Sequence, residues 1–246
     1  HLVVAVDVVS SPADQGQLYN IASQAKEELE VEDLTVLVDK GYYTGVDLEK
    51  CEQEHLETIV PRQKMPSHNG NEAYSKDKFI YNKENNTYTC PQGFIMTCSS
   101  KEETVNKVYK NFAACKNCPV KEDCTKSERG RKITRGEYEE VYERADKRYA
   151  GNKDLYHQRQ MIVEHVFGTV KRTLGFYYFL LRGNEKVKAE SHMHFFAYNL
   201  KRVINIIGTE KLTEYFKARI LLLFLSITEN KQKWVQNVIL SCSSVA

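Results

Sequence analysis

Four cysteines in the middle of the sequence have the spacing of metal ligands. Cys115 and Cys118 are two residues apart, so their thiolates can bind one tetrahedral ion, and Cys90 lies in a Cys-Pro-x-Gly turn typical of zinc-binding modules. Cys124 is the expected fourth ligand, and Cys98 is the alternative. Cysteines that only pack in a core are the other explanation, but this segment is rich in lysine. The pattern favours a structural zinc site, which would stabilise a module too small to fold on its own core.

Two carboxylates that are far apart in the sequence form a second candidate site. Asp39 follows an apolar run, and Glu164 lies beside the apolar stripe of an expected helix. Two-metal phosphoryl transfer uses carboxylates to hold a pair of divalent ions, so both residues suit Mg²⁺ or Mn²⁺. For either residue alone, a solvated surface carboxylate is the simpler explanation. A complete site needs a third carboxylate, and Asp7 is interpreted as structural because it falls in the middle of an expected strand.

The first sixty residues predict an α/β arrangement that would position Asp39. Residues 2–9 are rich in β-branched side chains and predict a buried strand, and Asp14 is expected to cap the helix that follows. Residues 34–38 predict a second strand, parallel to the first. Asp39 then lies at the carboxyl end of a strand, where open α/β sheets bind their ligands. A short helix over 46–54 and a brief strand over 57–61 complete this part.

The rest of the chain is expected to contain a linker, a cysteine-bearing module and long helices. Breaker residues predict a linker over 62–71, and residues 88–93 predict a hairpin. From Thr134 to about Leu174 the chain is expected to be mostly helical, with an interruption at 151–152. One face of the last helix there carries Val163, Val166, Phe167, Val170 and Leu174. Glu164 and Lys171 are two turns apart and share a polar stripe beside it. A long amphipathic helix is expected over 184–207, followed by a helix-prone tail.

Charge is distributed unevenly along the chain. The net charge is +2, but residues 1–60 hold 3 Lys or Arg against 13 Asp or Glu. Residues 126–188 hold 15 Lys or Arg, among them Arg172, against 9 Asp or Glu, with tyrosines and phenylalanines interleaved. Basic side chains can follow a phosphate backbone and aromatic rings can stack on unpaired bases, so this stretch predicts DNA binding. A charged helical surface over core tyrosines is the alternative. The longest apolar run, 220–227, is too short to span a membrane.

Several motifs occur in a characteristic order: Asp39-Lys-Gly-Tyr-Tyr43, the cysteine-bearing segment, Val163-Glu-His-Val-Phe-Gly168 and Asn199-Leu-Lys-Arg202. In this order they resemble the DDE transposases of bacterial insertion sequences, specifically a subgroup with a cysteine-rich insertion. The resemblance covers roughly residues 1–208. It implies an RNase H-like catalytic domain that uses Mg²⁺ for DNA strand cleavage and strand transfer. The implied partners are transposon ends and target DNA, with a homodimer as one option and no membrane. The implied location is the bacterial cytoplasm, at the nucleoid.

The resemblance also implies roles for single residues. Asp39 would be the second acidic residue of the catalytic triad and Glu164 the third. Lys171 would contact a DNA phosphate, and Tyr156 and Arg159 match the start of a signature that contacts DNA near the cleaved bond. Four residues, where the family has three, separate Arg159 from Glu164.

The resulting fold prediction is a truncated α/β, RNase H-like domain in which helices flank a mixed sheet. Residues 1–61 form its first part, 62–130 a zinc-ribbon-like insertion, 131–208 the helical remainder and 209–246 a tail. The family's first catalytic aspartate lies upstream of the segment matching residues 1–18. We therefore expect a piece of a longer chain, without a signal peptide, that does not cleave DNA by itself. A zinc-stabilised DNA-binding or interaction module without catalysis is the alternative. A nuclease of the same architecture, which hydrolyses without joining, is a third.

Overall fold

The computed structural model describes residues 2–62 and 71–243, with side chains up to residue 220. The chain divides into two compact units. One comprises Ser10–Met161, and the other combines the first nine residues with everything from Ile162 onward. The predicted linker over 62–71 falls almost entirely outside the described residues.

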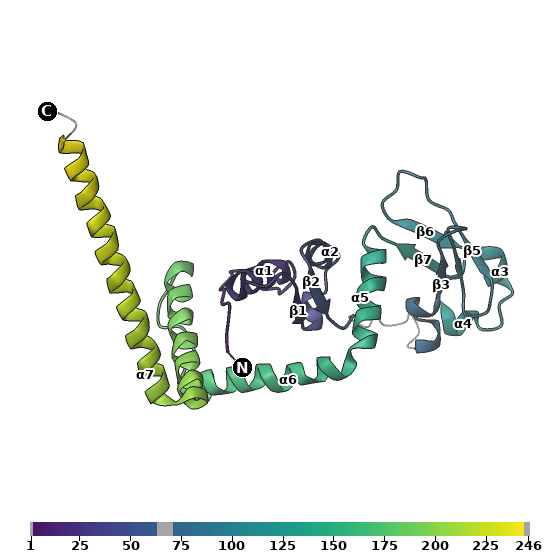
Figure 1. Cartoon of the computed structure of the whole chain (residues 1–246). Helices are drawn as coiled ribbons and strands as arrows, with labels where there is room; N and C mark the ends of the chain where they lie inside the picture. The colour runs from purple at the N-terminus through teal and green to yellow at the C-terminus, as the bar shows by residue number, and fades with distance from the viewer. Residues whose placement is uncertain (1, 63–70, 244–246) are drawn as a thin grey trace. The chain divides into compact units, whose positions relative to one another are not determined.

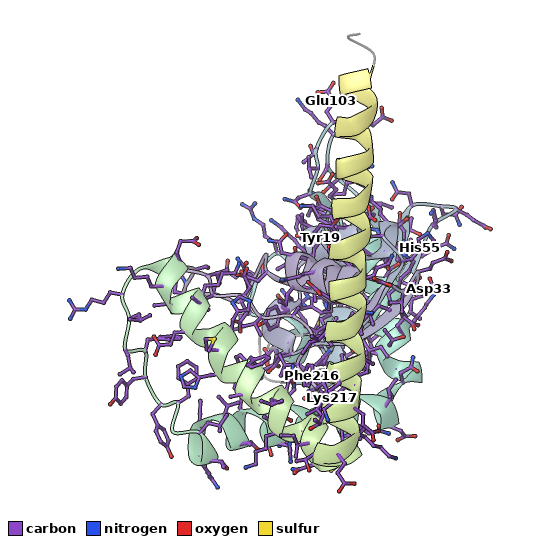
Figure 2. All side chains as sticks on the ribbon, turned by 60° about the vertical axis from the view of Figure 1, so that its left-hand side comes forward. Tyr19, Asp33, His55, Glu103, Phe216 and Lys217 are labelled. Atoms are coloured by element: carbon purple, nitrogen blue, oxygen red, sulfur yellow. The ribbon has the colours of Figure 1, made fainter. Side chains whose placement is uncertain are left out.

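The first unit begins with a compact α/β arrangement. Its elements are α1 (Leu18–Leu29), β1 (Leu34–Leu37), a 3₁₀ turn (Lys40–Tyr42), α2 (Gly45–Gln53) and β2 (Leu56–Ile59). β1 and β2 pair in parallel, with Leu34 opposite Leu56 and Leu37 opposite Ile59. The exposed side chains of Asp33 and His55 lie 3.9 Å apart just before the two strands begin (Figure 2). The strand predicted at 34–38, the helix at 46–54 and the strand at 57–61 are thus confirmed, with ends that differ by at most two residues.

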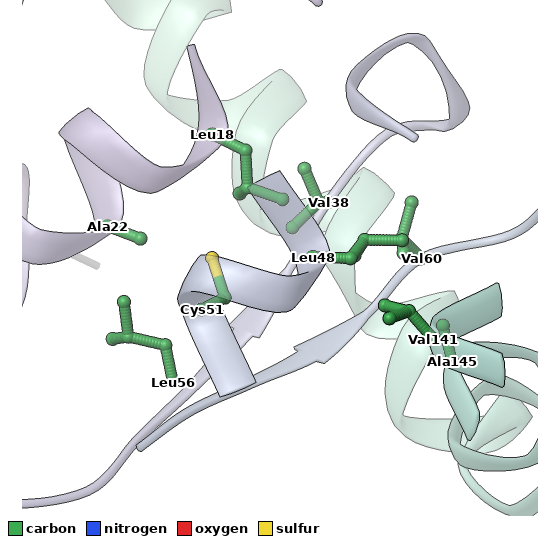
Figure 3. Packing of buried hydrophobic residues seen from close by; sticks show 9 residues of the cluster. All are labelled: Leu18, Ala22, Val38, Leu48, Cys51, Leu56, Val60, Val141 and Ala145. Atoms are coloured by element: carbon green, nitrogen blue, oxygen red, sulfur yellow. The ribbon is translucent and has the colours of Figure 1, made fainter. Parts of the chain in front are cut away.

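A single apolar core holds these elements together. It consists of buried side chains from α1, α2, α5 (Glu139–Gly151) and the two strands (Figure 3): Leu18, Ala22, Val38, Leu48, Cys51, Leu56, Val60, Val141 and Ala145. Leu18 and Ala22 are four residues apart on α1, so they share one helix face, as their spacing predicts. Burying such side chains contributes about 1.5–3 kcal/mol each for the larger ones. The core therefore fixes the strand end that carries Asp39.

The cysteine-bearing segment folds as a five-stranded antiparallel sheet (Figure 1). Its strands follow the chain order β3 (Ile80–Asn82), β4 (Thr87–Thr89), β5 (Ile95–Cys98), β6 (Lys107–Lys110) and β7 (Lys132–Arg135). Short helices α3 (Phe112–Lys116) and α4 (Lys121–Cys124) lie between β6 and β7, and 3₁₀ turns at Glu72–Tyr74 and Lys76–Lys78 precede β3. A small core supports the sheet: Phe79, Tyr88, Met96, Tyr109 and Ile133. The predicted hairpin at 88–93 is confirmed as the β4–β5 turn. The helical prediction from Thr134 on was wrong for its first residues, which form β7.

Long helices make up most of the remaining chain. α6 (Lys153–Gly168) follows α5 after a break at Asn152, where the prediction placed it. A π-helix (Thr169–Thr173) continues α6 directly, and α7 (Asn184–Ser243) contains one non-helical residue, Gly208. The helix predicted over 184–207 is confirmed, and beyond Gly208 the chain is helical up to Ser243. Among the described residues, none of the helices combines the length and apolar character that crossing a bilayer requires. Together with the two sheets, these helices form a mixed α/β fold compatible with an RNase H-like domain.

The expectation of a strand over residues 2–9 was wrong. These residues take part in no β-ladder, and Leu2, Val4 and Val9 are exposed. The side chain of Asn199 on α7 instead binds both polar backbone groups of Val3: its Oδ1 accepts from the Val3 N–H at 2.8 Å, and its Nδ2 donates to the Val3 carbonyl at 2.7 Å. The side-chain amide thus replaces a neighbouring strand at this one residue.

The expected apolar stripe along 163–174 was also only partly right. Val170 is buried, but Val163 and Phe167 are exposed. A π-helix follows directly after Gly168, within the range of this predicted stripe. The Leu174 N–H donates to the Thr169 carbonyl, five residues back, at 3.1 Å, so one turn holds an extra residue and the 3.6-residue repeat is interrupted.

Candidate functional site

Asp39 lies two residues beyond the last residue of β1, at the carboxyl end of the parallel pair, as predicted. Its Oδ1 accepts a hydrogen bond from the Lys40 N–H at 2.6 Å and so begins the 3₁₀ turn. The adjoining Val38 N–H donates to the Ile59 carbonyl at 3.0 Å, which continues the pairing up to this residue. The Asp39 side chain is 49% exposed. It is therefore a fixed carboxylate that solvent ions can reach.

Arg159 of α6 forms an ion pair with Asp39. The Arg159 Nη2 lies 3.3 Å from the Asp39 Oδ2, and its guanidinium carbon lies 5.9 Å from the centre of the Tyr156 ring. Burial raises the pKa of Tyr156, the guanidinium opposes that rise, and the Asp39 charge adds to it. Two residues assigned to DNA contact by resemblance, Tyr156 and Arg159, are thus brought together with Asp39 inside one unit.

Asp14 belongs to the same neighbourhood, and its expected role was wrong. The residue that precedes α1 is Gln17, which makes no side-chain capping bond, so Asp14 does not cap this helix. Its carboxylate instead approaches Gly41: a Cβ added there would lie 3.1 Å from the Asp14 Oδ2. Burial raises the pKa of Tyr42, and the charges of Asp14 and then Asp39 raise it further. The sequence analysis missed this second carboxylate, although the glycine after Asp39-Lys40 signals a close approach.

Glu164, Lys171 and Arg172 lie in the other unit, and all three side chains are exposed. Glu164 is on α6, whereas Lys171 and Arg172 are in the π-helix. The Lys171 ammonium lies 6.0 Å from the centre of the Phe167 ring, one turn earlier. Whether Glu164 and Asp39 hold one pair of metal ions stays a prediction.

Four cysteine side chains line one small cavity in the first unit. They are the predicted ligands Cys90, Cys115, Cys118 and Cys124, and the cavity has a volume of about 30 Å³. Cys98 does not line it and lies near the Ser100 carbonyl instead. The turn at Cys90 is closed by the Gly93 N–H, which donates to the Cys90 carbonyl at 2.8 Å. This arrangement distinguishes Cys124 from Cys98 as the fourth thiol of the group.

Arg131 is buried against this cavity without hydrogen bonds at two of its nitrogens. The residue is 8% exposed, and Nε and Nη1 have no partner among the described residues. The backbone at Gly130, with φ +117°, packs directly against Cys115. A Cβ at this position would lie 2.5 Å from the Cys115 Cβ. Burial raises the pKa of the Cys124 thiol, the Arg131 guanidinium opposes this rise, and the other three thiols add to it. Sequence reasoning missed Arg131, because a single arginine has no spacing pattern.

Neither the predicted carboxylates nor the four cavity thiols are arranged as a complete metal site. Across residues 2–62 and 71–220, no cluster of three or more His, Cys, Asp or Glu side chains has the geometry to hold a metal ion. All six cysteines there are free thiols. The four cavity thiols are neighbours, but metal ligation would require their side chains to converge further.

Residues 89–204 match a family model described as a transposase DDE domain. The matched range includes Glu164 and the four cavity cysteines, whereas Asp39 precedes it. The match supports a DDE transposase and hence a transposase function in general. Such domains typically use a divalent metal ion such as Mg²⁺, and they act on DNA. Searches among curated proteins and among solved structures gave no match.

Proposed function

We propose that this chain serves DNA strand cleavage and strand transfer in transposition, with Asp39 and Glu164 as the carboxylates that hold divalent metal ions. One observation carries the proposal: the Asp39 carboxylate is paired with Arg159 on α6, the helix in which Glu164 follows five residues later. The family match over 89–204 supports the same reading.

The donor set suits a hard divalent cation. Asp39 offers a half-exposed carboxylate oxygen that already attracts a positive group, and the Asp14 carboxylate lies near the same turn. Carboxylate oxygens are the ligands that Mg²⁺ and Mn²⁺ prefer. When bound, a metal pair would stabilise the attacking and leaving oxygens of a phosphodiester. The protein groups would orient the DNA: Lys171, Arg172 and Arg159 on phosphates, and the Tyr156 ring beside them.

Metal binding tests this proposal. The parent protein should bind Mn²⁺, as counted by the loss of the free-ion signal in electron paramagnetic resonance. Asp39→Asn and Glu164→Gln should each weaken this binding at least ten-fold, about 1.4 kcal/mol, because each removes a charged ligand. Glu32→Gln is a control at an acidic residue in the turn before β1. Unchanged binding in both site variants would contradict the proposal. DNA is the proposed partner, with a homodimer as an option, and the proposed location is the nucleoid in a bacterial cytoplasm.

The cavity thiols support a structural zinc ion as part of the same proposal. Tetrahedral zinc sites use four thiolates in this Cys-x₂-Cys arrangement, and such a site carries a net negative charge. The Arg131 guanidinium fits that charge: it is buried, two of its nitrogens lack hydrogen-bond partners among the described residues, and an uncompensated buried cation is costly. Zinc would then stabilise the insertion proposed for 62–130, whose described residues contribute four buried apolar side chains to the small core: Phe79, Tyr88, Met96 and Tyr109.

Elemental analysis tests the zinc proposal. Protein purified without added metal should contain one zinc per chain, and the Cys115→Ser/Cys118→Ser variant should contain none. Cys98→Ser is the matched control and should keep its zinc, because Cys98 lies outside the cavity. A parent free of zinc, or equal zinc in the double variant, would contradict the proposal.

A second candidate function is a zinc-stabilised DNA-binding or interaction module without catalysis. The thiol cavity favours it, because that feature does not depend on the carboxylates. The two candidates separate in the same experiments. This module would be favoured if Asp39→Asn and Glu164→Gln leave Mn²⁺ binding unchanged while the protein still binds zinc and DNA.

A further inference from the structure

The Asp39 carboxylate has both of its oxygens engaged. Oδ1 accepts from the Lys40 N–H at 2.6 Å, and Oδ2 lies 3.3 Å from the Arg159 Nη2. Oδ1 therefore holds the turn after β1, and Oδ2 is the oxygen left for a cation. That position is taken by the guanidinium.

The environment holds Arg159 in this place. Its side chain is only 22% exposed, and the Tyr156 ring lies one turn before it on the same helix. Asp14 and Asp39 both act on the nearby Tyr42 hydroxyl, so the guanidinium sits in a region of negative charge. A fixed arginine at such a site stabilises the carboxylates in the absence of metal.

We propose that Arg159 occupies the cation position at Asp39 and is displaced when a divalent ion binds. This inference rests on the proposed metal site. It makes Arg159 a positioning residue that restrains metal binding to the free protein. The displaced guanidinium becomes available to a DNA phosphate, which arginine binds through two parallel hydrogen bonds. Metal ions and DNA would then support each other's binding.

The test compares Mn²⁺ affinity among arginine variants of the full chain. Arg159→Gln should bind Mn²⁺ about two- to five-fold more tightly than the parent, the range expected for losing one partly exposed ion pair. Arg159→Lys keeps the positive charge and should bind like the parent. Arg144→Gln is the matched control: it removes the same charge from the same unit, but Arg144 pairs with Glu52 at 2.6 Å and not with Asp39.

A second readout follows the guanidinium directly. The Nε–H signal of Arg159 in a nitrogen–proton correlation spectrum should shift during a Mg²⁺ titration of the parent, and should stay in place in Asp39→Asn. The displacement of Arg159 would be overturned, and the metal site kept, by one result. In it Mn²⁺ binds with equal affinity to the parent and to Arg159→Gln, the binding still depends on Asp39, and the Arg159 signal does not move. No Asp39-dependent binding in either protein would overturn the inference together with the proposed metal site.

Discussion

Replacing Arg131 by methionine removes a buried charge while keeping most of the apolar side-chain volume. Two nitrogens of the Arg131 guanidinium have no hydrogen-bond partner among the residues that the structure describes. Each buried unsatisfied donor costs about 1–3 kcal/mol. Methionine forfeits the contact with the Phe79 ring, 5.7 Å from the guanidinium carbon, which is worth about 0.5–1 kcal/mol. Two such donors cost about 2–6 kcal/mol, so after the lost ring contact Arg131→Met should stabilise the zinc-free protein by about 1–5 kcal/mol.

With zinc bound, the sign should reverse. Four thiolates around one ion give the guanidinium an anionic partner, and hydrogen bonds to charged groups contribute about 1.5–3 kcal/mol. Arg131→Met should then destabilise the protein by about that amount, or lower its melting temperature by roughly 4–10 °C, since each kcal/mol shifts it by about 2–4 °C in a domain of this size.

The assay is urea unfolding followed by circular dichroism, for the parent and Arg131→Met, each saturated with zinc and each stripped by a chelator. Arg129→Met is the control for loss of one positive charge nearby, and its effect should be small in both states because Arg129 is exposed. An effect of Arg131→Met with the same sign and size in both states would refute the reasoning that the guanidinium balances metal-bound thiolates.

Three further predictions concern the fold around the sites. Gly45→Ala should destabilise the protein by about 1–3 kcal/mol in urea unfolding, because the new Cβ would lie 2.3 Å from the Tyr138 Cβ, whereas Gly151→Ala, with open space, should not. Burial opposes ionisation of Glu139, yet hydrogen bonds from a lysine and an arginine lower its pKa below 4.5. The ionised carboxylate therefore stabilises the fold above pH 4.5, and this contribution is lost as the pH falls below that value. Glu139→Gln should lower the free energy of unfolding by about 3 kcal/mol at pH 7 and reduce its fall at acidic pH. The same dependence of unfolding free energy on pH in the variant and the parent would refute this prediction. Asn199→Ala should speed amide exchange over residues 2–9 about ten-fold, and unchanged exchange would contradict the backbone clamp.

The sequence predicted the position of Asp39 well because the local pattern was sufficient. An apolar run that ends in Asp-Lys-Gly predicts both a strand and its end, and β1 with its 3₁₀ turn confirms it. The same reasoning failed for residues 2–9. Their β-branched composition is equally strand-like, but a strand also needs a neighbouring backbone to pair with. There the polar backbone groups of Val3 pair with the Asn199 side chain and not with another strand.

Side-chain partners were the least predictable feature of the site. The four cysteines that the spacing singled out line one cavity, whereas their role as zinc ligands stays a prediction. Arg131 and Asp14 were missed as site residues, since each reaches its site through a tertiary contact that has no local spacing pattern; Asp14 approaches Gly41, and Arg131 follows Gly130, which packs closely against Cys115. The interruption of the 163–174 stripe was missed as well, because a single extra residue in a π-helix turn leaves no mark on apolar periodicity.

Iron-directed cleavage of the polypeptide tests most directly whether Asp39 and Glu164 share one metal site. Fe²⁺ replaces Mg²⁺ among carboxylate ligands, and with ascorbate and peroxide it cuts the backbone near its own position. We expect cuts beside both residues in the parent, suppression of both by excess Mg²⁺, and loss of both in Asp39→Asn and in Glu164→Gln. Cuts at one residue only, or cuts beside Glu164 that persist in Asp39→Asn, would contradict the shared site.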